Sequence, residues 1–62
     1  MITLTKLNGM QFSLNAELIE TIEETPDTVI TTRTGKKYVV QESEEIVIQK
    51  VIAYKRLIYS PV

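Results

Sequence analysis

Few side chains in this 62-residue chain could carry out chemistry. The chain contains no histidine and no cysteine, so it lacks the commonest general base, the commonest transition-metal ligand and any thiolate. Its serines and threonines therefore have no histidine to activate them as nucleophiles. The composition also excludes disulfide bonds.

Carboxylates are the remaining candidates for acid–base or metal chemistry. Glu23-Glu24 and Glu44-Glu45 are adjacent pairs, and neighbouring residues of a strand point to opposite faces. Asp27 alone cannot form a calcium loop. The only two glycines, Gly9 and Gly35, lack the spacing of a nucleotide-binding loop. We therefore predict a protein that is not an enzyme and that has no catalytic residues, metal or cofactor.

The charge is nearly balanced, with eight acidic and seven basic residues and a net charge of −1. This balance argues against a purely electrostatic grip on nucleic acid or on an anionic membrane. Acidic residues nevertheless cluster in the stretch 17–27, and basic residues follow in the stretch 33–37. Such runs are typical of a solvated surface.

No apolar run approaches the ~20 residues that a membrane span needs. The N-terminus lacks the basic start and apolar stretch of a signal peptide. We therefore expect a cytoplasmic protein that does not insert into a membrane, and a single domain over residues 1–62.

Two hairpins are expected in the first two thirds of the chain. Residues 2–7 and 10–14 alternate between apolar and polar, and Asn8-Gly9 between them predicts a type I′ turn. Residues 28–33 and 37–41 are rich in β-branched residues, and Gly35 supplies the positive φ of the turn between them.

The run 18–24 fits either a helix or a strand. Ile19 and Ile22 are three residues apart, which suits a helix, whereas its β-branched content and short length suit a strand. Pro26 cuts the run off too soon for a stable helix, so we predict a strand. Pro26 and Asp27 are then expected to form the next turn.

A helix is predicted over residues 43–58. Ser43 is a suitable N-cap, acidic residues crowd the first turn, and Lys55 and Arg56 complement the other end. Seven residues cover an apolar arc of roughly 160° at 100° per residue, and we expect this arc to pack on the sheet. They are Val47, Ile48, Val51, Ile52, Tyr54, Ile58 and Tyr59.

Ile46 and Leu57 form a separate apolar strip on this helix, outside that arc. A chain of this length buries only about 60% of its unfolded surface, so it can hardly surround the helix. We therefore expect a homo-oligomer or a partner-binding surface at Ile46, Lys50, Leu57 and Tyr59. The fold class is accordingly α+β, a five-stranded, mostly antiparallel meander with one C-terminal helix.

Nucleic-acid binding is an alternative hypothesis. Arg33, Lys36 and Lys37 could face a phosphate backbone while Tyr38 stacks on a base. The acidic stretch that precedes them weighs against it, and an ordinary surface hairpin accounts for the same residues.

The order and spacing of several short motifs resemble the small flagellar FlbD family, also called SwrD, of swarming motility proteins. The motifs are Leu7-Asn8-Gly9, Leu14-Asn15, Ile19-Glu20, Pro26-Asp27-Thr28, the run 35–40, and Val51, Tyr54, Lys55 and Arg56 in the helix. The resemblance covers residues 2–56. Met10 and Gln11 depart from the more polar residues expected after Asn-Gly.

The resemblance implies a cytoplasmic accessory protein of the bacterial flagellum, placed at the cytoplasmic side of the motor. Such a protein would support torque by contacts with the stator units, and the family carries no assigned catalytic or ligand residues. A fainter similarity links the run 18–40 and its following helix to the LytTR DNA-binding domain. That similarity implies a small nucleic-acid-binding regulatory module as the alternative function.

Overall fold

A computed structural model describes the backbone of residues 1–59 and the side chains of residues 1–57. The strands are β1 (Ile2–Thr5), β2 (Gln11–Leu14), β3 (Ile19–Glu24), β4 (Thr28–Thr32) and β5 (Lys37–Val40). A 3-10 helix, η1 (Ala16–Leu18), precedes β3, and the helix α1 (Glu44–Tyr59) ends the described chain. The predicted α+β class is confirmed, and each strand and α1 begin and end within two residues of the predicted range.

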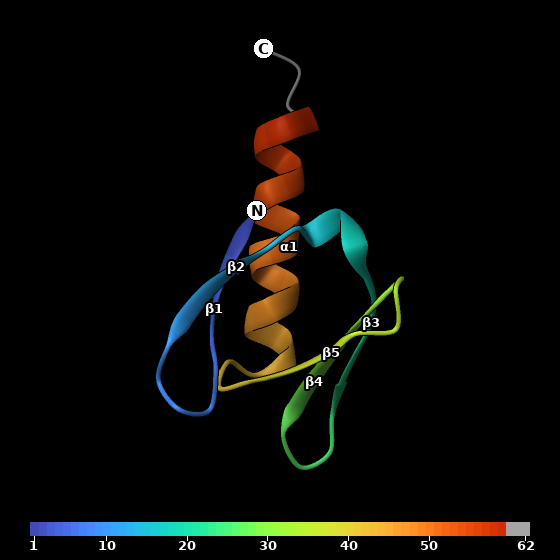
Figure 1. The fold of residues 1–62 in the computed structure, drawn as a ribbon. Coiled ribbons are helices and arrows are strands. Elements are labelled where there is room, and N and C mark those ends of the chain that lie inside the picture. Colours follow the sequence, from blue (N-terminus) through green and yellow to red (C-terminus); the bar gives the residue numbers. More distant parts are fainter. Residues whose placement is uncertain (60–62) are drawn as a thin grey trace.

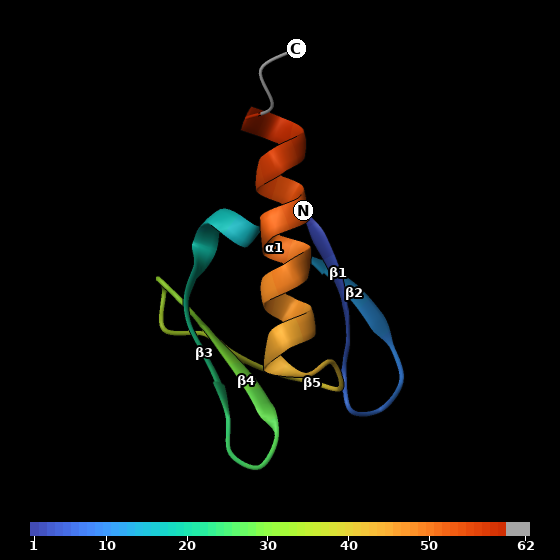
Figure 2. The same cartoon turned by 180° about the vertical axis from the view of Figure 1, so that it is seen from behind.

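The five antiparallel strands are divided between two sheets. β1 pairs with β2, and β4 lies between β3 and β5 in the second sheet. Within residues 1–59, a single bridge between Lys6 and Val40 joins the sheets, and the Gln41 amide donates to the Thr5 carbonyl over 2.8 Å. Figures 1 and 2 show α1 on one side of both sheets, with its C-terminal part extending beyond the strands.

The turn of the first hairpin differs from the predicted type I′ turn. The Gly9 amide donates to the Lys6 carbonyl over 2.9 Å, and the Lys6 amide donates to the Met10 carbonyl over 2.8 Å. Gly9 has a φ of 90°, while Asn8 is not among the residues with positive φ. The prediction of type I′ was therefore wrong, because the loop has three residues and needs positive φ only at its last position.

The second hairpin repeats this arrangement. Gly35 has a φ of 85°, its amide donates to the Thr32 carbonyl over 3.0 Å, and the Thr32 amide donates to the Lys36 carbonyl over 2.8 Å. The positive φ predicted at Gly35 is confirmed. No atom beyond the two neighbouring residues lies within 4 Å of where a Cβ would stand, so the backbone conformation alone favours glycine there.

Shorter connections join these hairpins. The Asn15 side chain accepts from the Glu17 amide over 3.0 Å and caps η1, a short helix that the sequence did not predict. The peptide bond before Pro26 is cis, and the amide of Thr25 donates to the carbonyl of Asp27 over 3.2 Å. The turn predicted at Pro26 and Asp27 therefore closes through the main chain.

One small hydrophobic core lies between the two sheets and α1. Apolar residues of β1, β4 and β5 alternate inward, and Val47 enters from α1. The Phe12 and Tyr38 rings stack with centroids 5.3 Å apart and connect the two sheets. The buried residues of this core are Ile2, Leu4, Leu14, Ala16, Ile30, Val40 and Val47.

Candidate functional site

The N-terminus of α1 is fixed by side chains that lie far apart in the sequence. Ser43 caps the first turn as predicted, with its hydroxyl accepting from the Ile46 amide over 3.3 Å. The Glu24 carboxylate at the end of β3 accepts from the Glu44 amide over 2.8 Å. A carboxylate at this end also interacts favourably with the helix dipole. These contacts determine the direction in which α1 leaves the sheets.

Gln41 and Glu42, which lie between β5 and α1, are hydrogen-bonded to the first hairpin. Glu42 accepts two hydrogen bonds from Thr5, one from its amide over 2.9 Å and one from its hydroxyl over 2.8 Å. The Gln41 side chain donates to the carbonyls of Lys6 and Leu7 over 3.0 and 3.3 Å. Partial burial acts to raise the pKa of Glu42, but the hydrogen bonds from Thr5, aided by Lys50, outweigh it and lower that pKa.

The face of α1 that packs on the core is narrower than the predicted apolar arc. Val47 is fully buried, and Val51 and Tyr54 pack partly against the core. Ile48 and Ile52 belong to the predicted arc but are 43% and 46% exposed. That part of the prediction was wrong, because the small sheets reach only one strip of the helix.

Two exposed apolar ridges therefore flank the buried face of α1. We define the first ridge as Ile46, Ala53 and Leu57, which share one face at spacings of seven and four residues. The second ridge is Ile48 and Ile52, four residues apart. Exposed apolar surface of this extent on a small domain is typical of an interaction site.

The residues predicted for an oligomer or partner surface fall on or beside the first ridge. Ile46 is 42% exposed and Leu57 is 84% exposed, while Lys50 is half-buried between the ridge and the core. The side chain of Tyr59 lies outside the described residues. A shallow groove of about 320 Å³ runs along this ridge, lined by Met1, Ile2, Thr3, Lys50, Ala53, Tyr54 and Leu57.

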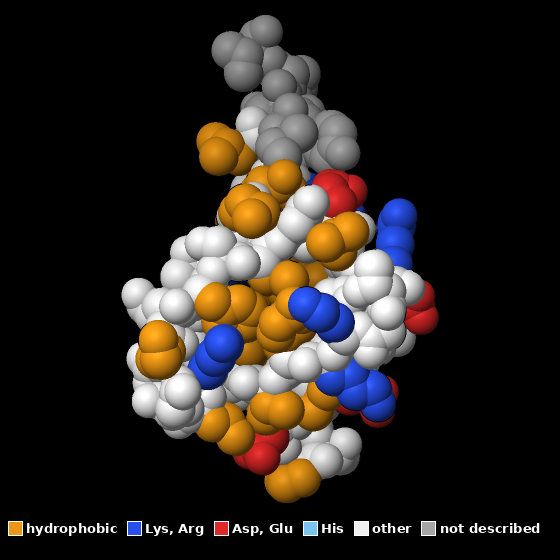
Figure 3. Space-filling model, in the orientation of Figure 1, with side chains coloured by type: hydrophobic (Ala, Val, Ile, Leu, Met, Phe, Trp, Pro, Cys, Tyr) orange, Lys and Arg blue, Asp and Glu red, His pale blue; other side chains and the backbone are white. Residues whose placement is uncertain are grey.

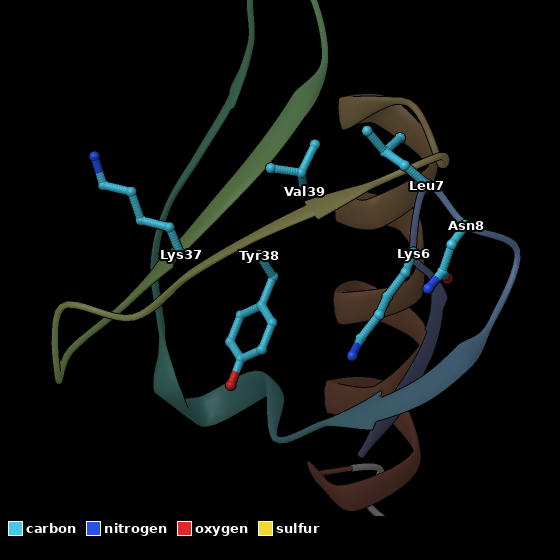
Figure 4. A pocket seen from close by; sticks show the side chains of 6 residues that line it. All are labelled: Lys6, Leu7, Asn8, Lys37, Tyr38 and Val39. Atoms are coloured by element: carbon cyan, nitrogen blue, oxygen red, sulfur yellow. The ribbon is translucent and has the colours of Figure 1, made fainter.

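A second pocket, of about 370 Å³, lies between the first hairpin turn and β5. Lys6, Leu7 and Asn8 line one side, and the β5 residues 37–39 line the other (Figure 4). The Lys6 ammonium stands 5.6 Å from the centre of the Phe12 ring, within range of a cation–π interaction. Figure 3 shows apolar surface bordered by basic side chains on the sheet side of the molecule.

The residues of the nucleic-acid hypothesis are only partly brought together. Arg33, Lys36 and Lys37 are exposed around the second hairpin turn. Tyr38 is half-buried, with one face of its ring stacked on Phe12, so at most its other face could meet a base. The basic residues and the aromatic ring do not form one continuous stacking platform.

Several positioning residues escaped prediction. Thr5 and Glu42 are 37 residues apart, and Glu24 and Glu44 are 20 residues apart, so no local pattern indicates either contact. Within residues 1–59, no group of three carboxylates is placed to hold a metal ion. No helix in this part of the chain is long and apolar enough to cross a membrane.

The fold and its exposed ridges define a small α+β protein whose most prominent surface is the apolar outside of a single helix. A family model described as flagellar and swarming motility proteins, FlbD, matches residues 1–59. The chain therefore belongs to the FlbD family of flagellar and swarming motility proteins. Neither the curated proteins nor the solved structures contain a match.

Proposed function

We propose that this protein is a non-enzymatic flagellar accessory that supports swarming by binding a motor component, with the stator units as the partner. Membership of the FlbD family supports the flagellar setting. The observation that carries the proposed mechanism is the first ridge of α1, where Leu57 is 84% exposed. Burying such a ridge against a partner would provide the favourable contact area that the isolated domain leaves in water.

The geometry of α1 suits docking. Its N-terminal turns are held by Ser43 and Glu24, whereas its C-terminal part extends beyond the strands (Figure 2). A helix presented in this way can lie in an apolar groove of another protein, with residues three to four apart as anchors. The same surface could hold a second copy of the chain, as the sequence led us to expect.

Deletion of the gene and complementation with single variants test this function. We expect deletion to reduce swarming and motor torque without abolishing filaments. Ile46→Glu and Leu57→Glu should fail to restore torque, because a carboxylate on the ridge opposes apolar docking. Gln49→Glu introduces the same charge at an exposed position outside both ridges and should restore it.

The protein level of each variant should be compared by immunoblot, so that lost torque is not mistaken for lost protein. Unchanged motility in the deletion strain would overturn the proposed function. Full complementation by Leu57→Glu at a normal protein level would overturn the role of the first ridge.

The alternative function, a small nucleic-acid-binding module, is supported by the exposed Arg33, Lys36 and Lys37. It predicts retention on DNA or RNA that weakens steeply with added salt. If the protein caused no mobility shift of DNA or RNA at low salt, this alternative would be excluded.

A further inference from the structure

The three-stranded sheet has two open edges. β4 is its central strand, so β3 and β5 each pair on one side only, apart from the bridge between Lys6 and Val40 within the described residues. The Thr32 amide donates to the Lys36 carbonyl, and hydrogen-bonded pairs alternate along an antiparallel ladder. The main-chain groups of Lys37 and Val39 therefore point away from β4.

The same alternation identifies the free groups of β3. Ile30 is hydrogen-bonded toward β5, so Val29 and Thr31 are hydrogen-bonded toward β3, where they face Glu23 and Thr21. The main-chain groups of Ile22 consequently point outward. The β3 edge at Ile22 and the β5 edge at Lys37 thus present main-chain donors and acceptors to another strand, whereas the end of β5 is occupied by the first hairpin, through the Lys6–Val40 bridge and the bond from the Gln41 amide to the Thr5 carbonyl.

The two edges carry opposite charges. β3 contains Glu20, Glu23 and Glu24 and no basic residue. The β5 edge carries Lys36 and Lys37, with Arg33 in the preceding turn and Lys6 across the pocket. Contacts between two β3 edges or between two β5 edges would place like charges together, whereas a contact between β3 and β5 places opposite charges together.

The side-chain faces match as well. Glu23, Val29 and Val39 lie in one cross-strand row on the outer face, and Lys37 lies on that face one row away. Ile22 and Tyr38 both pair with Ile30, and these three residues share the core face. A β3 strand added beside β5 with its faces aligned would therefore place Glu23 on the side of Lys37 and Ile22 on the side of Tyr38.

The pocket beside β5 provides room for the added side chains. It opens between residues 37–39 and the first hairpin turn, has a volume of about 370 Å³, and has Lys6 on its far wall (Figure 4). Leu7 and Val39 are 55% and 38% exposed at this site, so apolar surface is also available for burial.

We propose that the acidic β3 edge of one copy of this protein binds the basic β5 edge of a second copy, head to tail. Because the two surfaces differ, such contacts form rings or open chains of copies rather than two-fold dimers. The ridges of α1 take no part in the contact and remain available to another protein. The inference is independent of the proposed function.

Charge reversal on one edge at a time tests the proposal in solution. The mass of the purified full chain is measured by sedimentation against protein concentration, at about 0.05 M and about 0.5 M salt. We expect wild-type protein to associate beyond two copies at low salt and to weaken with added salt. Lys37→Glu or Glu23→Lys alone should weaken association by about tenfold.

Mixing the two variants is the decisive step. Lys37→Glu retains an intact β3 edge and Glu23→Lys retains an intact β5 edge, and the two reversed edges also carry opposite charges. An equimolar mixture should therefore regain the association that neither variant shows alone. Lys55→Glu and Glu45→Lys make the same charge changes at exposed positions of α1 and should associate as wild type does. Thermal melts of all variants verify that each is folded.

A wild-type chain that stays monomeric at low salt and high concentration would overturn the proposal. It would also be overturned if both charge reversals left association unchanged, or if only Leu57→Glu abolished it. In the latter case the first ridge of α1, rather than the sheet edges, would join the copies. None of these outcomes depends on motility, so they are separate from the test of the proposed function.

Discussion

The two halves of α1 both contain many apolar residues but have different surroundings. In the first half, Val47 is fully buried, and Ser43 and Glu24 hold the free amides of the first turn. In the second half, Leu57 is 84% exposed, and the helix extends beyond the strands (Figure 1). The first half is therefore anchored in the core through Val47, whereas the helix is most exposed toward the end of its second half, at Leu57.

This difference shows how a small domain divides its apolar residues. The sheets are short, with four to six residues per strand, so they cover little more than one strip of a sixteen-residue helix. Apolar residues beyond that strip add little to the free energy of unfolding, because they remain in water in both states. Mutations can separate the two roles by their effects on stability.

The largest expected effect is at Val47. Val47→Ala should lower the free energy of unfolding by about 2 kcal/mol, since it removes two methyl groups from a fully buried site and leaves a cavity. Ile52→Ala, on the second ridge, should cost well under about 1 kcal/mol because that side chain is nearly half exposed. Urea unfolding followed by circular dichroism measures both, and equal losses would contradict the division of the helix.

A smaller effect on stability is expected at Gly35, in the turn between β4 and β5. Gly35→Val should cost roughly 1–2 kcal/mol, because a β-branched residue would be forced to positive φ. Gly35→Asn should cost less, since asparagine tolerates this conformation better. If the sheet and α1 form one unit, thermal melts monitored for strand and for helix should shift together. If α1 melted at a different temperature from the strands, the claim that its first half belongs to the core would be contradicted.

The Glu24 cap on the N-terminus of α1 should contribute still less to the free energy of unfolding. Glu24→Ala should cost about 1 kcal/mol, because the Glu44 amide loses its acceptor at the positive end of the helix. Glu20→Ala, a neighbouring exposed glutamate in the same strand, is the matched control. Hydrogen exchange should localise the loss to the first turn of α1 rather than to its second half. Equal stability of the two variants would argue against the cap.

The smallest effect concerns pH and Glu42. Hydrogen bonds from Thr5 lower the pKa of Glu42 below its ordinary value of 4.5 in the folded state. The resulting stability is fully present above the unfolded pKa and is lost as pH falls through the folded pKa. Denaturation from neutral pH into the acid range should show a shallower decline for Glu42→Gln than for wild type. An identical decline would show that the carboxylate does not hold the first hairpin to α1.

Local chemistry was sufficient to predict the five strands, α1 and their order. Alternating residues predicted the strands, Gly35 predicted positive φ, and Ser43 predicted the start of the helix, because each depends on neighbours within a few positions. The turn type at Asn8 was wrong because a two-residue and a three-residue loop share the same sequence signal, and only strand register distinguishes them.

The candidate surfaces could be predicted only in part. The first ridge follows from helical periodicity, and the structure leaves Ile46 and Leu57 exposed there. The exposure of Ile48 and Ile52 was missed, since periodicity gives the direction of a side chain and not the width of the sheet beneath it. The opposite charges of β3 and β5 are visible in the sequence, but their placement on opposite edges is not.

The class of fold, the positions of the turns and the absence of histidine and cysteine chemistry follow from the sequence alone, because they depend on composition and on short-range backbone preferences. The division of the strands between two sheets, the contacts of Glu24 and Glu42 that hold α1 in place, and the choice of the buried strip of α1 arise from tertiary packing. The hydrogen bonds of Glu24 and Glu42 join residues 20 and 37 positions apart, where loop closure and packing act together and no local pattern records the result.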